Sequence, residues 1–368
     1  MTSRREFLGM SAAMLAAGGV GGTAMGRADK SRSILMLGGT GFLGPQVVEA
    51  AVRRGHRVTL FNRGKTRPGL FPGLEKLHGD RETGDLEALK GRKFDAVVDT
   101  SANVPRWVKQ AADVLGPDLG QYVYISSVSV YSDLSKPGAD ESAAVATIAD
   151  PKVEKVDGQT YGALKALSEK AAEAACPGKA AVVRPGLIVG PEDPSDRFTY
   201  WPVRIARGGE VLAPGAPDDP IQLIDVRDLG EFLVRLIEDR TMGVFNALGP
   251  AESLSMGRTL AACKAASGSD ATFTWADAAF LEKEGVQPWS DMPAWVPNGG
   301  ESAGFAKVSN ARAIKAGLTF RPILDTAKAT LDWFRAQSPE RRAKLRAGIT
   351  PEREAKVLAA WKSRLPRP

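Results

Sequence analysis

The sequence predicts an α/β fold built on a doubly wound parallel sheet, with a smaller C-terminal cap. From residue 33 onward, short β-branched apolar runs alternate with amphipathic stretches, and a glycine-rich turn follows the first run. After Pro191 this alternation gives way to loops rich in proline and glycine. Strands separated by helices at such intervals form a parallel sheet with helices on both faces, and right-handed crossovers make it doubly wound, as in Rossmann-like folds.

Each element follows from its local pattern. The apolar runs predict strands at 33–39, 56–64, 74–80, 94–101, 121–132 and 180–190. The stretches between them predict helices at 45–55, 85–91, 105–115 and about 160–175. A helix at 226–239 and a strand at 243–249 then return to the same domain, and a last helix begins at Thr350, with Pro351 at its first position.

The composition indicates a folded globular protein. A quarter of the 368 residues are charged, the formal net charge is +6, and the basic residues are scattered, so nucleic acid is an unlikely partner. No apolar run in the body of the chain is long enough to cross a bilayer. The two cysteines are too few for a disulfide framework, and the two histidines lack the spacing of metal ligands, so we predict no metal site.

Residues 1–28 resemble a twin-arginine export signal. Arg4 and Arg5 precede Phe7-Leu8 and a weakly apolar stretch rich in alanine and glycine, although Gly9 stands where the usual lysine would be. We therefore expect a mature protein that is exported already folded, to the periplasm or another extracytoplasmic place.

The turn after the first strand has the spacing of a dinucleotide fingerprint. Gly38 permits the tight turn, Gly41 lets the backbone approach a pyrophosphate, and Gly44 lets helix and strand pack closely. The amides at the start of the helix, around Phe42 and Leu43, would face the phosphates. The alternative is a tight strand-to-helix turn with no ligand.

The end of the second strand favours NADP over NAD as cofactor. An NAD site normally has an acidic residue there, whereas this chain has Asn62-Arg63, and Arg63 with Lys65 can pair with a 2′-phosphate. The alternative is an arginine that is merely solvated. Asp80 is placed to accept from the adenine amino group or to cap the next turn. The remaining expected cofactor contacts are Arg81, Ser101 and Pro185.

A tyrosine and a lysine share one helical face after the fifth strand. Tyr161 and Lys165 are four residues apart, and a cation is needed to make a phenol a useful base near neutral pH. Ser126, Ser127 and Ser129 lie in the last part of the fifth predicted strand, near the carboxyl edge of the sheet, where a hydroxyl can hold a reacting oxygen.

With these motifs in this order, residues 33–335 resemble the extended short-chain dehydrogenase/reductase family, also called the NAD-dependent epimerase/dehydratase family. The resemblance implies that Ser127 is the active hydroxyl, Tyr161 the general acid/base, and Lys165 its activator and a ribose ligand. It also implies that the segment around Pro185 closes over the nicotinamide. A homodimer through the helices at 105–115 and 160–175 would be in keeping with the family.

Two departures from the family pattern narrow the reaction. Dehydratases carry an Asp-Glu pair where this chain has Val128-Ser129, and many nucleotide-sugar epimerases carry Phe-Asn where it has Pro185-Gly186. We therefore expect an NAD(P)-dependent epimerase or oxidoreductase that transfers hydride at a secondary alcohol or ketone of a carbohydrate-like substrate. The alternative is a non-catalytic nucleotide- or RNA-binding module, because chloroplast stem-loop RNA-binding proteins share the fold.

These assignments divide the chain. Residues 29–190, with about 222–248, form the predicted dinucleotide-binding domain, residues 191–221 and 249–335 the substrate-binding cap, and residues 336–368 a helical basic tail. The cap segment from Arg197 to Arg207 is rich in aromatic and basic residues. It predicts either a wall that recognises sugars or anions, or an amphipathic helix with packed aromatics and solvated arginines; Trp289 and Trp295 pose the same choice.

Overall fold

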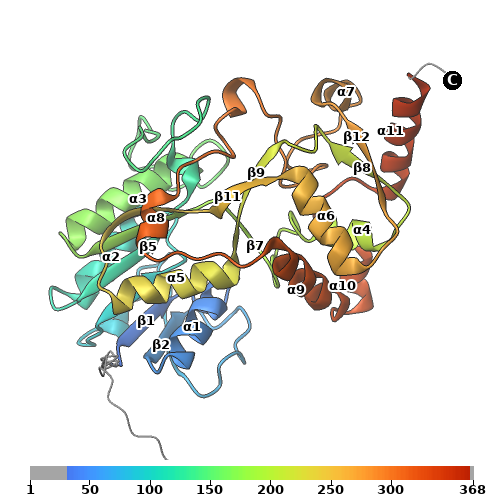
Figure 1. Ribbon diagram of the computed structural model, residues 1–368. Helices are drawn as coiled ribbons and strands as arrows, with labels where there is room; N and C mark the ends of the chain where they lie inside the picture. Colours follow the sequence, from blue (N-terminus) through green and yellow to red (C-terminus); the bar gives the residue numbers. More distant parts are fainter. Residues whose placement is uncertain (1–30, 365–368) are drawn as a thin grey trace, which may run out of the picture. The chain divides into compact units, whose positions relative to one another are not determined.

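The computed structural model describes residues 31–364, so the predicted signal peptide lies outside the described residues (Figure 1). Within that range a seven-stranded parallel sheet has the order β10-β6-β5-β4-β1-β2-β3. Its strands are β1 (Ser33–Leu37), β2 (Arg57–Asn62), β3 (Glu75–His78), β4 (Ala96–Asp99), β5 (Gln121–Ile125), β6 (Ala180–Pro185) and β10 (Gly243–Ala247). The order reverses between β1 and β4, which is the switch point where ligands of open α/β sheets bind.

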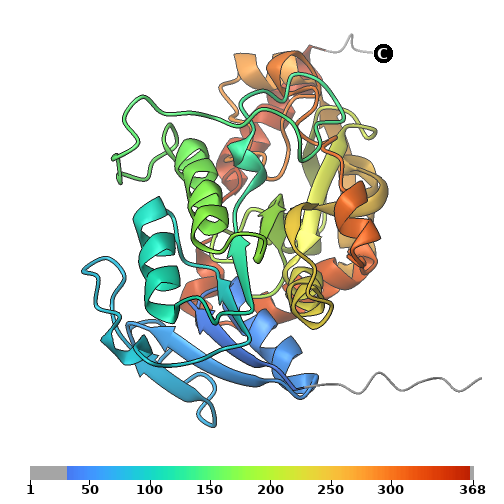
Figure 2. The ribbon, with the colours of Figure 1, turned by 90° about the vertical axis from the view of Figure 1, so that its left-hand side faces the viewer.

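Helices cover both faces of this sheet, as the alternation of patterns predicts. On one face, α1 (Leu43–Arg53) packs beside α5 (Val226–Glu238), and on the other α2 (Pro105–Leu115) packs beside α3 (Tyr161–Ala175) (Figures 1 and 2). The apolar side chains of the strands alternate between the two layers: Ile34 and Met36 belong to the first core, and Leu35 and Leu37 to the second. The predicted doubly wound fold is confirmed.

Three predicted elements are wrong in extent. The helix at 85–91 is only a 3₁₀ turn (Glu87–Leu89), and Gly91 follows it at a φ of 71° that ends the turn. The strand predicted at 121–132 ends at Ile125, and a 3₁₀ turn (Val128–Val130) occupies part of the remaining range. The strand at 180–190 divides at Pro185, and β7 (Leu187–Val189) leaves the main sheet for a smaller one; a proline has no amide to continue the ladder.

The second part of the described chain has its own apolar core. It contains a three-stranded sheet, β11-β9-β7, and a two-stranded one, β12-β8. The strands are β8 (Glu210–Pro214), β9 (Pro220–Asp225), β11 (Gly249–Ser255) and β12 (Thr272–Ala276), and the helices are α4 (Tyr200–Ala206), α6 (Met256–Ser267), α7 (Ala278–Lys283), α9 (Ile323–Arg335), α10 (Pro339–Ala343) and α11 (Pro351–Ser363). The last helix is part of this core, because Val357 and Leu358 are buried in it and Glu354 pairs with Arg204 at 2.6 Å. The short helix α8 (Ala311–Lys315) packs instead on β10 of the main sheet, and its Ala313 belongs to the core under α1 and α5.

Among residues 31–364, no helix combines the length and the apolar character needed to cross a bilayer.

Candidate functional site

A cavity of about 820 Å³ opens at the carboxyl edge of the main sheet. It extends from the turn after β1 to the ends of β5 and β6 and to the loop that follows β7. Every predicted site residue lines it: Gly38, Gly41, Phe42, Leu43, Gly44, Asn62, Arg63, Asp80, Arg81, Ser101, Ser127, Tyr161, Lys165 and Pro185. The structure therefore brings these residues together, while the role of each remains a prediction.

The glycine turn contains one glycine that internal packing does not explain. A Cβ on Gly44 would lie 2.5 Å from the carbonyl oxygen of Gly38, and Gly38 has a φ of 94° and stands against Thr100, so both need glycine for the turn itself. A Cβ on Gly41 would meet nothing closer than 3.9 Å, and Gly41 faces the cavity. This open cradle of backbone beside the start of α1 fits a ligand diphosphate.

The end of β2 presents two basic side chains to the cavity. The side chain of Asn62 caps the turn by accepting from the amide of Gly64 at 2.7 Å. Arg63 and Lys65 are exposed at the cavity and make no hydrogen bond or ion pair with any residue between 31 and 364. Both are thus available for an anion. Asp80 accepts from the amide of Glu82 at 3.0 Å, so the predicted alternative of a turn cap does occur.

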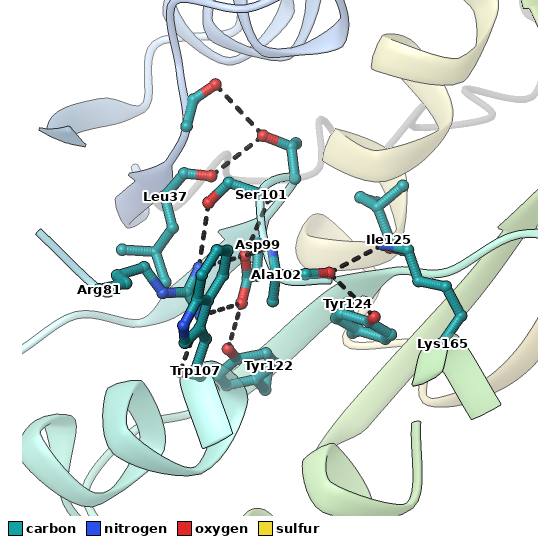
Figure 3. Close-up of polar contacts among 12 residues, drawn as sticks. Leu37, Arg81, Asp99, Ser101, Ala102, Trp107, Tyr122, Tyr124, Ile125 and Lys165 are labelled. Carbon is teal, nitrogen blue, oxygen red and sulfur yellow. Dashed lines mark hydrogen bonds and ion pairs between the residues drawn. The ribbon is translucent and has the colours of Figure 1, made fainter. Parts of the chain in front are cut away.

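Arg81 reaches the cavity wall, but its guanidinium is directed into the protein (Figure 3). It forms two hydrogen bonds with the fully buried carboxylate of Asp99, at 2.6 and 2.8 Å, and Tyr122 donates to the same carboxylate at 2.6 Å. Arg81 also donates to Ser101 at 3.1 Å and to the carbonyl oxygen of Trp107 at 2.8 Å. This network ties the segment after β3 to the end of β4 and thereby shapes the floor of the site.

Ser127 and Tyr161 approach each other because α3 packs closely on the turn after β5. Gly162 allows this contact, since a Cβ there would overlap the carbonyl oxygen of Ser129. Burial raises the pKa of Tyr161, while hydrogen bonding with Ser127 lowers it. Ser127 also donates to the hydroxyl of Ser129 at 3.0 Å. The pair offers two hydroxyl groups to one substrate oxygen.

Lys165 is buried, and its ammonium group is bound by backbone. It donates to the carbonyl oxygens of Ala102 at 2.8 Å and Ile125 at 2.9 Å (Figure 3) and lies 5.9 Å from the ring centroid of Tyr161. Burial lowers the pKa of Lys165 to about 8. The charge of Arg197, from the loop after β7, also lowers the pKa of Tyr161.

The two predictions for the stretch from Arg197 to Arg207, a ligand-binding wall or an amphipathic helix with packed aromatics, each hold for some of its residues. Phe198, Tyr200 and Trp201 are buried core residues, as the amphipathic reading predicts. Arg197 alone among the basic residues of this stretch lines the cavity, with Trp289 and Phe305 beside it. Phe305 was missed by the sequence analysis, because no local pattern distinguishes it.

The fold and the site define an α/β protein with a dinucleotide-type glycine turn and a Ser-Tyr-Lys group on one cavity. Residues 34–247 match the model of the NAD-dependent epimerase/dehydratase family. The chain therefore belongs to this family, which confirms the resemblance seen in its motifs.

Two curated relatives match part of the chain. It is 28% identical over 244 residues to the chloroplast stem-loop binding protein of 41 kDa b from Arabidopsis thaliana, covering 60% of each chain. It is 32% identical over 182 residues to 2-alkyl-3-oxoalkanoate reductase from Stenotrophomonas maltophilia, covering 44% of this chain and 52% of that protein. The chain thus spans only about half to three fifths of the length of these relatives.

Solved structures share the fold. The Bordetella bronchiseptica enzyme WbmH in complex with NAD⁺ superposes with a TM-score of 0.60 at 17% identity, over 83% of this chain and 99% of that one. The UDP-glucuronic acid 4-epimerase from Bacillus cereus in complex with NAD superposes with a TM-score of 0.59 at 17% identity, over 82% and 97%.

Proposed function

We propose that this protein is an NAD(P)-dependent epimerase or reductase that acts at a secondary alcohol or ketone of a carbohydrate-like substrate. The observation that carries the proposal is the common cavity: Ser127 and Tyr161 line the same space as the open glycine turn at Gly41. Membership of the family supports a nicotinamide dinucleotide as cofactor. Structural neighbours in complex with UDP-glucuronic acid and UDP-glucose favour a substrate with sugar character.

The chain's own residues would bind the substrate oxygen and move its proton. A bound nicotinamide dinucleotide would supply the hydride acceptor and donor. In its phenolate form Tyr161 takes the hydroxyl proton when the carbinol is oxidised, and as the resulting phenol it returns that proton when the ketone is reduced; Ser127 donates a hydrogen bond to the same oxygen. Lys165 holds α3 against the end of β5 through its two carbonyl contacts, which keeps Tyr161 beside Ser127.

The cofactor preference that we propose is NADP. Arg63 and Lys65 are exposed at the cavity without a partner in the described part of the chain, and the end of β2 has no acidic residue for the ribose hydroxyls. The NAD complexes among the structural neighbours concern chains at most 19% identical, so they leave this preference to experiment.

The test measures dinucleotide binding first and turnover second. The purified protein is titrated with NAD⁺ and NADP⁺ by calorimetry, and the absorbance of reduced nicotinamide is then followed with a panel of sugars. Tyr161→Phe should retain dinucleotide binding and lose turnover by about 10²- to 10⁴-fold. Tyr200→Phe is the matched control, because that buried hydroxyl has no partner among residues 31–364 and does not line the cavity. Equal activity of Tyr161→Phe and wild type would refute the assigned acid/base.

The second candidate is an RNA-binding module, which the 28% identity to the chloroplast stem-loop binding protein favours. Phosphate-driven binding weakens steeply with salt. Tight, salt-sensitive binding of an RNA stem-loop, together with absence of any dinucleotide binding, would replace the enzyme proposal with this one.

We also propose export through the twin-arginine pathway, on the sequence of residues 1–28 alone. A fusion of the full chain to a reporter should appear outside the cytoplasm, and replacement of Arg4 and Arg5 by lysines should keep it inside. Export that is unaffected by this change would refute the pathway.

A further inference from the structure

Arg197 is a partly buried cation without a carboxylate partner. Its Nε donates to the hydroxyl of Ser195 at 3.1 Å, and its guanidinium carbon lies 5.2 Å from the ring centroid of Trp289. Within residues 31–364 it forms no ion pair, and its two terminal amino groups make no hydrogen bond. A half-buried guanidinium normally finds acceptors within the protein. Since Arg197 lines the cavity, its two terminal amino groups are donors left for a ligand there.

The loop that carries Arg197 is held firmly in place. Ser195 accepts from Arg197 and donates to Asp193 at 2.7 Å, which links the three side chains. The fully buried carboxylate of Asp196 pairs with Arg341 and accepts from the amide of Arg346 at 2.9 Å. The segment after α9 therefore anchors the loop, so the guanidinium is preorganised rather than free to find its own partner.

Arg197 is also the cation at the reacting end of the cavity. Arg197 lines the same cavity as Tyr161 and Ser127, and its charge lowers the pKa of Tyr161. Lys165 is bound by two backbone carbonyls. Arg63 follows β2, three strands from β5, which at strand spacing is about 14 Å away.

The form of this cation favours a carboxylate. With Nε already bonded to Ser195, the guanidinium presents its two terminal amino groups, which match the two oxygens of one carboxylate. A diphosphate would bring more negative charge toward a single cation that already has the buried carboxylate of Asp193 nearby. The ring of Trp289, itself packed edge-on against Phe305 at 5.4 Å, flanks the site with an apolar face.

We propose that Arg197 binds a carboxylate of the substrate, so that the substrate is a hydroxy acid of sugar type with its acid group close to the reacting carbinol. This inference rests on the proposed function and specifies its substrate class. Asp193 and Ser195 act as positioning residues for the guanidinium. Trp289 covers the site on one side and holds the planar cation over its ring.

The experiment measures binding of acid and neutral sugars to the protein saturated with the dinucleotide. Glucuronate and galacturonate are compared with glucose and galactose by calorimetry, and UDP and UDP-glucose form a third arm. Wild type should bind the acids more tightly than the neutral sugars. Arg197→Met should weaken acid binding by about 10- to 100-fold and leave neutral sugars unchanged. Arg197→Lys should restore only part of the loss, because an ammonium lacks the two-pronged geometry.

Arg207→Met is the matched control, because Arg207 is exposed at the end of α4 and does not line the cavity. Equal affinity of wild type for acids and neutral sugars, or no binding of either acid, would overturn the proposal. Loss of UDP binding in Arg197→Met without a selective loss of acids would do the same, since the cation would then serve a diphosphate. Absence of dinucleotide binding in wild type would instead refute the proposed function, so the two failures are distinguishable.

Discussion

Lys165 donates a hydrogen bond of 2.9 Å to the carbonyl oxygen of Ile125, and so fastens α3 to the carboxyl end of β5. The lysine that the motif assigns to chemistry is thus also a structural tether. A second bond, to the carbonyl oxygen of Ala102, extends the tether to the segment after β4. These contacts hold Tyr161, one helical turn earlier, at the mouth of the cavity.

The buried lysine predicts a pH-dependent contribution to stability. The pKa of Lys165 is about 8 in the folded protein against an ordinary value of 10.5, so between these values the unfolded chain binds more protons and the stability of the fold rises with pH. Relative to Lys165→Met, the free energy of unfolding of wild type should grow by up to about 3 kcal/mol across this interval. Urea unfolding of both proteins over this pH range measures it.

Lys170→Met removes an exposed lysine from the same helix and serves as the comparison. A wild-type advantage over Lys165→Met that stays constant with pH would show that the buried ammonium does not titrate in this window.

Two glycine substitutions should separate packing from ligand binding. Gly44→Ala places a Cβ 2.5 Å from the carbonyl oxygen of Gly38 and should destabilise the fold strongly. Gly41→Ala meets nothing within 3.9 Å and should melt like wild type while losing dinucleotide affinity. Thermal melting and calorimetric titration with NAD⁺ and NADP⁺ test both. Unaltered dinucleotide affinity in Gly41→Ala would argue against a diphosphate at this turn.

The exposed arginine after β2 should decide the choice between the two cofactors. Arg63→Ala should weaken NADP⁺ binding by about 10-fold or more and leave NAD⁺ binding nearly unchanged, because only NADP⁺ carries the 2′-phosphate. Arg57→Ala is the control, since Arg57 is exposed at the opposite end of the same strand. Equal losses for both dinucleotides would discredit the selective role.

The buried network of Arg81, Asp99 and Tyr122 should contribute more to the free energy of unfolding than any exposed ion pair. Arg81→Met leaves the buried carboxylate of Asp99 without its cation and should lower the free energy of unfolding by about 3–5 kcal/mol. Lys93→Met, which removes an exposed partner of Asp118, should leave the melting temperature close to that of wild type. A mild effect of Arg81→Met would mean that water solvates Asp99 in the variant.

The core of the fold could be predicted because its signals are local. Ile34 and Met36 alternate with Leu35 and Leu37, and this strand leads directly into the glycine turn, so periodicity and turn chemistry agree within a dozen residues. The errors lie where nothing in the nearby sequence indicates that a continuous local pattern is divided between two elements. The apolar run across Pro185 reads as one strand, and only pairing with β9 shows that Leu187–Val189 belongs to another sheet.

The sequence by itself determined the doubly wound sheet, the glycine turn, and the residues that gather around it, because each depends on spacing along one or two neighbouring elements. Only the tertiary structure decided what their side chains face. It turned Arg81 inward to Asp99, bound Lys165 to two carbonyls, and brought Arg197 and Trp289 from distant loops to the cavity that Tyr161 lines. Such contacts depend on how separate elements pack in space, and the spacing of residues along the chain does not specify that packing.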